Sequence, residues 1–175
     1  MRTRHAAPAQ RTRAYRNRPR RPGSGRPDAF SLLELVLALA ILVTVAAIAA
    51  PRYANAVARY RADMAAYRLA ADLEHARTCA KSASSSQAVV FQPGSDRYEL
   101  TGQEDPDHRG LPYQVVLRAE PYYADLTAAA FGSSGATVTF DGFGMPDQGG
   151  QVTLQVGDET RTVLVDADTG RITVQ

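Results

Sequence analysis

The hydrophobic pattern of the chain starts with one long apolar tract, residues 30–50. The tract, FSLLELVLALAILVTVAAIAA, is apolar at every position except Ser31, Glu34 and Thr44. As a helix rising about 1.5 Å per residue it would extend about 31 Å, close to the thickness of a bilayer's hydrocarbon core. A secretory signal has a shorter apolar region of about 7–15 residues, with a small-residue cleavage site after it. The pattern therefore predicts a membrane-spanning helix.

The pattern becomes amphipathic in the following segment, residues 51–83. Apolar residues recur at alternating steps of four and three, which is typical of one helical face; they are Tyr53, Val57, Tyr60, Met64, Tyr67 and Ala71. We expect the helix to continue to about Ser82 and to pack this tyrosine face beneath the domain that follows. The arginines and aspartates of the segment, Asp72 included, lie mostly off that face. Pro51 lacks an amide donor, so a helix kink is expected there.

Residues 84–175 read as short strands separated by turns. Period-2 alternation and turn signals predict seven strands: Ala88–Gln92, Arg97–Thr101, Tyr113–Ala119, Ala136–Phe140, Gln151–Val156, Thr160–Asp166 and Arg171–Val174. The stretches Thr101–Pro112 and Glu120–Gly135 are expected to be loops or less regular. The predicted fold class is α+β, with a long N-terminal helix packed on a small antiparallel sheet or sandwich.

The charge of the chain is divided between two regions of opposite sign. Residues 1–29 hold nine arginines and one acid, whereas the rest holds 11 basic and 17 acidic side chains, a balance of −6. The basic run could be an arm that binds nucleic acid or anionic lipid, or a cytoplasmic flank that sets membrane orientation. The apolar tract directly after it favours the flank.

Glu34 is the one charged residue of the tract. A carboxylate inside a membrane is costly and marks a functional site with a partner. Near the start of a helix it could instead reach the interface, where an acid suits the helix dipole. Its position alone leaves both interpretations open.

The sequence Phe-Ser-Leu-Leu-Glu, followed by an apolar run and Pro51, closely resembles the N-methylation motif of type IV pilins and type II secretion pseudopilins. The resemblance implies that a prepilin peptidase removes residues 1–29 as a leader, cutting between Ala29 and Phe30, and that the new amine of Phe30 is methylated. The residue before the cut is usually glycine in that family, and here it is Ala29. The resemblance also implies that Glu34 pairs with the N-terminal amine of a neighbouring subunit during assembly.

The C-terminal part contains Phe140-Asp141-Gly142, Gly144-Met145-Pro146 and a last hairpin through Gly170-Arg171. In these residues it is similar to the globular domain of the GspH/FimT group of minor pseudopilins and minor pilins. The similarity implies a minor pseudopilin of a type II secretion system, at the tip or start of a filament of several pilins. The protein would then be anchored in the bacterial inner membrane, with its leader cytoplasmic and its C-terminal domain periplasmic.

The alternative is a FimT-like minor pilin that acts in pilus assembly or DNA uptake. In that branch a Gly-Arg-x-Arg element contacts DNA, which makes Arg171 a candidate DNA contact. The second arginine is missing from Gly170-Arg171-Ile172-Thr173. Because phosphate binding depends on clustered cations, the balance of −6 also argues against DNA as a partner.

The chemistry-bearing side chains favour no enzyme, metal or cofactor. No serine, histidine and acid have the context of a nucleophile elbow or triad. Asp166 and Asp168 lack the rest of a calcium-loop pattern and are interpreted as a hairpin turn. The cluster of Asp105, Asp107 and His108 is interpreted as a solvated loop. The single cysteine, Cys79, excludes an internal disulfide and is expected to be a small buried residue.

Overall fold

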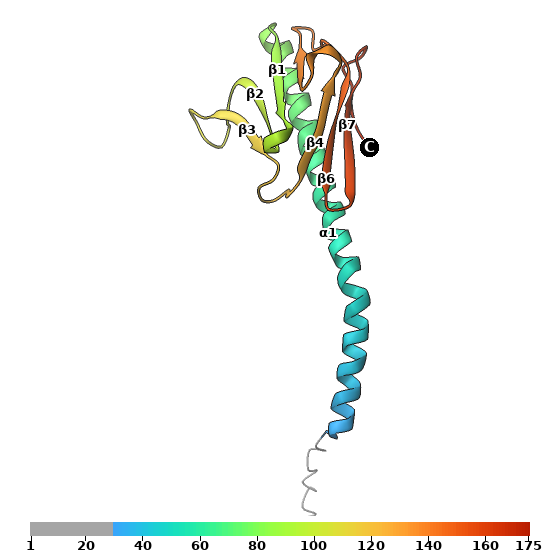
Figure 1. Cartoon of the computed structure of the whole chain (residues 1–175). Helices are drawn as coiled ribbons and strands as arrows, with labels where there is room; N and C mark the ends of the chain where they lie inside the picture. The colour runs from blue at the N-terminus through green and yellow to red at the C-terminus, as the bar shows by residue number, and fades with distance from the viewer. Residues whose placement is uncertain (1–29) are drawn as a thin grey trace, which may run out of the picture. The chain divides into compact units, whose positions relative to one another are not determined.

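The computed structural model describes residues 30–175, so Ala29 and the predicted leader, residues 1–29, lie outside the described residues. Helix α1 (Leu32–Ala83) is 52 residues long and runs without interruption through Pro51. The predicted end near Ser82 is thus confirmed, whereas the kink at Pro51 stays a prediction. The chain divides after Ile41 into two compact units; the second, which begins at Leu42, contains the whole of the β structure (Figure 1).

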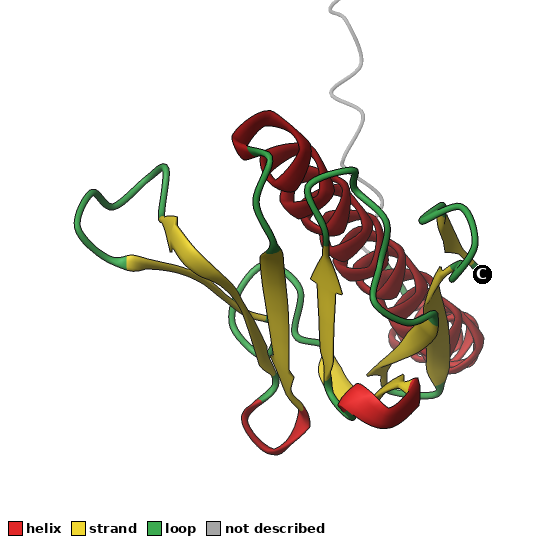
Figure 2. Ribbon diagram, turned by 90° about the horizontal axis from the view of Figure 1, so that it is seen from above, coloured by secondary structure: helices red, strands yellow, loops and turns green. Residues whose placement is uncertain are grey.

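Eight strands and two short 3-10 helices follow α1. They are β1 (Gln87–Gln92), η1 (Pro93–Ser95), β2 (Arg97–Glu104), β3 (Pro112–Val116), β4 (Asp125–Phe131), η2 (Gly132–Ser134), β5 (Thr137–Phe140), β6 (Gly150–Val156), β7 (Glu159–Val165) and β8 (Ile172–Val174). They form two four-stranded sheets, a first sheet in the order β3-β2-β1-β5 and a second in the order β4-β6-β7-β8. All pairs are antiparallel. The predicted α+β class is confirmed, and the C-terminal part of α1 lies along one side of the strands (Figure 2).

Strand β4 was missed by the sequence prediction, which expected an irregular segment between Glu120 and Gly135. The strand is rich in alanine, which has a low intrinsic preference for strands. Its pairing with β6 is also shifted between Leu126 and Ala128, so the burial pattern does not alternate cleanly. Tertiary pairing along the edge of the second sheet makes this segment a strand. The prediction of seven strands was therefore wrong by one.

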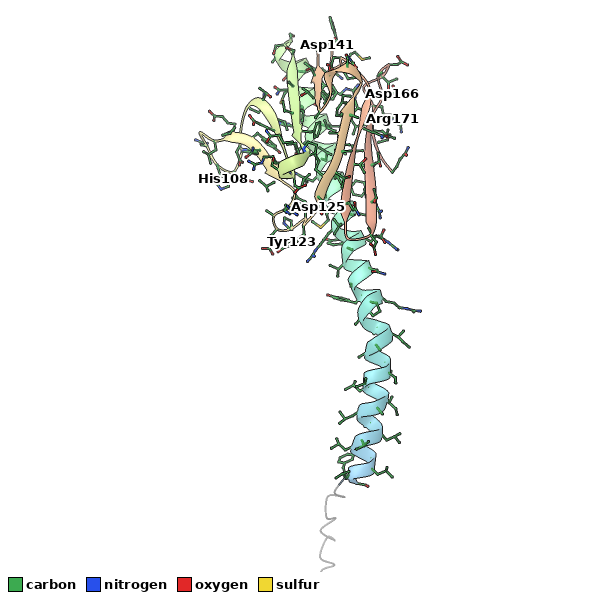
Figure 3. The ribbon with its side chains drawn as sticks, in the orientation of Figure 1. His108, Tyr123, Asp125, Asp141, Asp166 and Arg171 are labelled. Carbon is green, nitrogen blue, oxygen red and sulfur yellow. The ribbon has the colours of Figure 1, made fainter. Side chains whose placement is uncertain are left out.

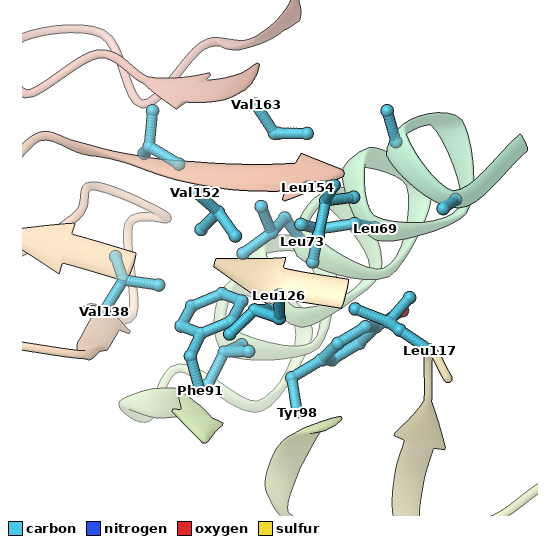
Figure 4. Packing of buried hydrophobic residues seen from close by; sticks show 14 of the residues in the cluster. Leu69, Leu73, Phe91, Tyr98, Leu117, Leu126, Val138, Val152, Leu154 and Val163 are labelled. Atoms are coloured by element: carbon cyan, nitrogen blue, oxygen red, sulfur yellow. The ribbon is translucent and has the colours of Figure 1, made fainter. Parts of the chain in front are cut away.

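The core lies between α1 and the two sheets (Figure 4). The helix contributes a face of small and medium side chains that are completely buried or nearly so: Ala62, Ala65, Ala66, Leu69, Leu73, Ala76 and Ala80. The strands contribute the large ones, among them Tyr98, Phe131 and Phe140, which are 0% exposed. Each buried Leu or Phe side chain stabilises the fold by about 1.5–3 kcal/mol relative to an exposed one.

The tyrosine face of α1 is not the face that packs on the sheets, so the sequence prediction was wrong on this point. Tyr53, Tyr60 and Tyr67 are 74%, 65% and 65% exposed. Two faces of this segment have helical periodicity, and side-chain size decides between them. Alanines let the helix approach the strands closely enough for the large strand residues to fill the space between, whereas a row of tyrosines would hold the helix away.

Candidate functional site

The apolar tract carries the first group of candidate residues, and its large side chains are exposed. Every residue from Phe30 to Ala50 is exposed, and Phe30 itself is 82% exposed. By length and composition, α1 is the one helix among the described residues that is apolar enough to cross a membrane. In water such a surface would be strongly unfavourable, because each buried CH₂ contributes about 0.8 kcal/mol. The tract therefore requires a lipid or protein environment.

Glu34 lies in the first turn of α1, and its side chain is exposed. The helix begins with the amide of Leu35 donating to the carbonyl of Ser31 at 3.1 Å. A carboxylate at this end is favoured by the unpaired amides of the first turn. No ion pair joins Glu34 to another residue in the range 30–175. The carboxylate is thus available to a cation from another molecule.

Two arginines join the helix to the β6–β7 hairpin. Arg59 donates to Glu159 at 3.1 Å, and Nε of Arg161 donates to Asp63 at 2.5 Å. The hydrogen bond to Asp63 raises the pKa of Arg161, and the hydrogen bond from Arg59 lowers the pKa of Glu159. These pairs tie the exposed margin of the helix to the second sheet.

A buried carboxylate, Asp72, joins the helix to the first sheet. The residue is 5% exposed. It accepts hydrogen bonds from the hydroxyl of Tyr98 at 2.6 Å, the hydroxyl of Tyr113 at 2.8 Å and Nε of Arg68 at 3.0 Å. A second nitrogen of Arg68 donates to the Tyr113 hydroxyl at 2.8 Å. Burial and the nearby carboxylate raise the pKa of Tyr98, and the same causes raise the pKa of Tyr113 to about 12.

This network corrects the sequence interpretation, which placed Asp72 off the packed face. Its two tyrosine partners lie 26 and 41 residues away along the chain, and no local pattern joins them to Asp72. A buried charge is tolerated when its lone pairs are satisfied, and here three donors surround one carboxylate. The network therefore holds the β2–β3 hairpin in a fixed position on α1.

Arg77 joins the two C-terminal turns that carry the GspH/FimT-like residues. Its Nε donates to the carbonyl of Gly144 and a terminal nitrogen to the carbonyl of Thr169, both at 2.9 Å. Gly170 has φ +63°, and a Cβ there would lie 2.9 Å from the Gly144 carbonyl oxygen. Only glycine fits this conformation and this close approach. The turns are distant in sequence but adjacent in space, and an arginine in an amphipathic helix gave no signal of this role.

Arg171, labelled in Figure 3, is exposed. It lines a hollow of about 570 Å³ along β7, β8 and the turn between them. In this turn, Asp166 accepts from the amide of Thr169 at 2.9 Å and from its hydroxyl at 2.7 Å. These bonds lower the pKa of Asp166. The carboxylate closes a hairpin turn, as the sequence indicated.

The remaining candidates are found in a loop and on the helix. Nδ1 of His108 lies 3.1 Å from Asp105, and the amide of Asp107 also donates to Asp105. Within residues 30–175, no three His, Cys, Asp or Glu side chains are grouped so that they could hold a metal ion. Cys79 is half-buried, with its Sγ 3.6 Å from Nε2 of His75.

Comparison with known proteins gives one family. The family described as type II transport protein GspH matches residues 65–169. Two crystal forms of the type IV minor pilin FimU from Pseudomonas aeruginosa are similar in structure. One is 20% identical, with 67% of this chain and 90% of FimU covered and a TM-score of 0.48. The other is 16% identical, with 65% and 91% covered and a TM-score of 0.46. No curated protein matches the chain.

Proposed function

The chain belongs to the GspH family of type II transport proteins, and from this premise we propose that it is a minor pseudopilin of a type II secretion system. In this role it is a non-enzymatic subunit that joins other pseudopilins at the tip or start of a filament during protein export. The observation that carries the proposal is the exposed apolar tract, residues 30–50, whose single charge is Glu34. A surface of this kind is stored in lipid and then transferred into a bundle of like helices.

The proposed maturation follows from the N-terminal motif. A prepilin peptidase at the cytoplasmic face of the inner membrane cuts between Ala29 and Phe30, and the amine of Phe30 is methylated. The arginines of the leader hold that end in the cytoplasm, and the C-terminal domain enters the periplasm. Glu34 of one subunit then pairs with the N-terminal amine of its neighbour. Since removing one partner of a buried ion pair costs about 3–5 kcal/mol, this pairing sets which helices assemble and in which register.

The proposal is tested by replacing Glu34 with glutamine, which keeps the shape of the side chain and removes its charge. The variant is expected to insert into the membrane normally and to be absent from filaments formed with the family's major subunit. The matched control is Glu74→Gln, an exposed acid on the same helix with one weak ion pair to Arg77 at 3.6 Å. Mass spectrometry of the mature protein should find a methylated Phe30. Normal co-assembly of Glu34→Gln, or an intact leader on assembled protein, contradicts the proposal.

A FimT-like minor pilin acting in pilus assembly or DNA uptake is the second candidate, and the exposed Arg171 is the observation that favours it. The described residues carry 11 basic against 17 acidic side chains, which opposes binding to a polyanion. The test is an electrophoretic shift of duplex DNA by the purified protein at several salt concentrations. A salt-sensitive shift that Arg171→Ala removes would place DNA uptake ahead of secretion.

A further inference from the structure

Strand β3 forms an open edge of the first sheet. Its one strand neighbour is β2, with Tyr113 opposite Leu100 and Val115 opposite Tyr98. The amide of Leu117 donates to the carbonyl of Asp96 at 2.8 Å. This bond shows that every second residue counted back from Leu117, namely Val115 and Tyr113, is at a hydrogen-bonded position of the β2–β3 pair. Because hydrogen-bonded pairs alternate in antiparallel strands, the backbone groups of Gln114 and Val116 point away from β2. Outside the ladder, no backbone hydrogen bond of these two residues occurs within residues 30–175.

This edge is weakly protected against an added strand. Natural sheets block such edges with charged side chains, prolines or a covering segment. Pro112 begins β3, but neither Gln114 nor Val116 carries a charge. Val116 is 42% exposed, and Leu111 beside the strand is 56% exposed. The edge therefore offers unpaired backbone groups next to apolar surface.

A hollow of about 340 Å³ adjoins this strand. Its lining includes Tyr113, Val115 and Tyr122 together with three acids, Asp105, Asp107 and Glu120. His108, whose Nδ1 lies 3.1 Å from Asp105, lines it as well. Arg68 also borders it, but Asp72 already neutralises that charge at 3.0 Å. The loop that carries His108 and the loop that carries Tyr123 are both visible in Figure 3.

The charge around the hollow selects the occupant. Residues 96–125 hold seven acids and three arginines, a balance of −4, which is most of the −6 of residues 30–175. A second copy of the chain paired edge to edge would bring two such regions together, and like charges across a sheet edge are destabilising. A basic segment is attracted, since its cations meet carboxylates in a partly enclosed site.

We propose that the β3 edge and the adjoining hollow bind an extended segment of a partner protein that carries lysine or arginine at alternate positions. The segment adds to the first sheet as a fifth strand, with its backbone paired to Gln114 and Val116. Every second side chain enters the hollow, where its aliphatic stem lies on the tyrosine rings and its charged head reaches the carboxylates. This binding does not depend on whether the chain acts in a secretion filament or a pilus.

The test uses the full chain in detergent micelles and a fluorescent peptide of alternating lysine and valine, followed by fluorescence anisotropy. Saturable binding is expected. A peptide N-methylated at alternate valine amides, which cannot pair along one edge, is expected to bind at least about tenfold more weakly, as the loss of one or two hydrogen bonds predicts. A peptide of alternating glutamate and valine is expected not to bind.

Matched charge reversals locate the site. The double variant Asp107→Lys/Glu120→Lys should weaken binding of the lysine peptide at least about tenfold. The control Asp158→Lys/Asp168→Lys makes the same charge change at two exposed turns of the second sheet and should change it less than about twofold. Hydrogen exchange of the Gln114 and Val116 amides should slow when the peptide binds, which reports on the edge directly.

Each contrary outcome overturns the proposal. If the N-methylated peptide binds as tightly as the unmodified lysine peptide, strand pairing is excluded. If the control variant weakens binding as much as Asp107→Lys/Glu120→Lys does, the attraction comes from the overall charge of the chain and not from this site. Absence of saturable binding, unprotected amides at Gln114 and Val116, or self-association of the chain through β3 also contradicts it. An unchanged unfolding midpoint of the double variant separates loss of the site from loss of the fold.

Discussion

Asp72 offers the sharpest test of how the fold is held together, because one substitution changes three hydrogen bonds. In Asp72→Ala the hydroxyl of Tyr98, a residue that is 0% exposed, loses its acceptor. Tyr113 retains a hydrogen bond from Arg68, and Arg68 is 42% exposed and regains water. An unsatisfied buried hydroxyl costs about 1–3 kcal/mol, and a hydrogen bond to a charged group contributes about 1.5–3 kcal/mol. We therefore expect Asp72→Ala to lower the free energy of unfolding by about 3 kcal/mol.

The measurement is urea unfolding of the full chain in detergent, followed by near-UV circular dichroism of the tyrosines, because the chain has no tryptophan. Tyr98→Phe removes only the hydroxyl and should cost about 1–2 kcal/mol. If the two residues act through their shared hydrogen bond, the double variant is less destabilised than the sum of the two single variants. Glu74→Ala is the control, because an exposed acid with one surface ion pair should change stability by less than about 1 kcal/mol.

Two results would refute this reasoning. Destabilisation by Asp72→Ala no larger than that of Glu74→Ala would mean that the carboxylate does not anchor the hairpin. Strict additivity with Tyr98→Phe would mean that the 2.6 Å bond contributes nothing to stability.

Two further predictions concern the contacts between α1 and the strands. The pKa of Tyr113 is raised from its ordinary value of 10.0 to about 12 in the fold. The stability that the protonated hydroxyl of Tyr113 contributes is therefore fully present below about pH 10 and is lost as pH rises toward about 12. Unfolding midpoints across this range should fall less steeply in Tyr113→Phe than in the unchanged protein, and an equal fall would contradict the raised pKa of Tyr113. Leu69→Ala, at a position 0% exposed, should lower the free energy of unfolding by about 2–5 kcal/mol, whereas Tyr60→Ala, at 65% exposure, should change it by less than about 0.5 kcal/mol. Urea unfolding of both variants measures this difference. A larger loss of unfolding free energy in Tyr60→Ala than in Leu69→Ala would mean that the tyrosine face, and not the alanine face, packs in the core.

The elements that sequence predicts well are those whose signal is local. The helix end and most of the turns follow from Ser84-Ser85-Ser86, Pro93-Gly94 and similar clusters, and the structure agrees to within a few residues. The alternation of TVTF, residues 137–140, predicts β5 directly. Strand β4 has no such pattern, because its alanines become a strand through pairing with β6 rather than through their own preference.

The contacts that sequence cannot supply join distant segments. Asp72 and Arg77 lie on a helix whose periodicity is satisfied by two faces, and neither has a local partner that explains its burial or its bonds to the strands and turns. The sequence prediction placed the face with the large tyrosine side chains in the core, whereas the buried face is the one with the alanines. Only the strand residues opposite the helix determine that alanines, and not tyrosines, fit beneath them.

The two parts of the chain constrain its function independently. The N-terminal motif, residues 30–34, and the whole apolar tract lie before Ala65, where the match to the GspH family begins. Within the matched region, Arg77 draws together Gly144 and Thr169, so the similarity of the two C-terminal turns is one spatial feature rather than two separate ones. A plain membrane anchor has no need of the whole motif Phe-Ser-Leu-Leu-Glu, although an acid near the helix start suits the helix dipole in any anchor. A soluble relative of the domain would have no reason to carry the tract. The tract and the domain together therefore favour a filament subunit, and Glu34 is the residue at which that inference is most directly tested.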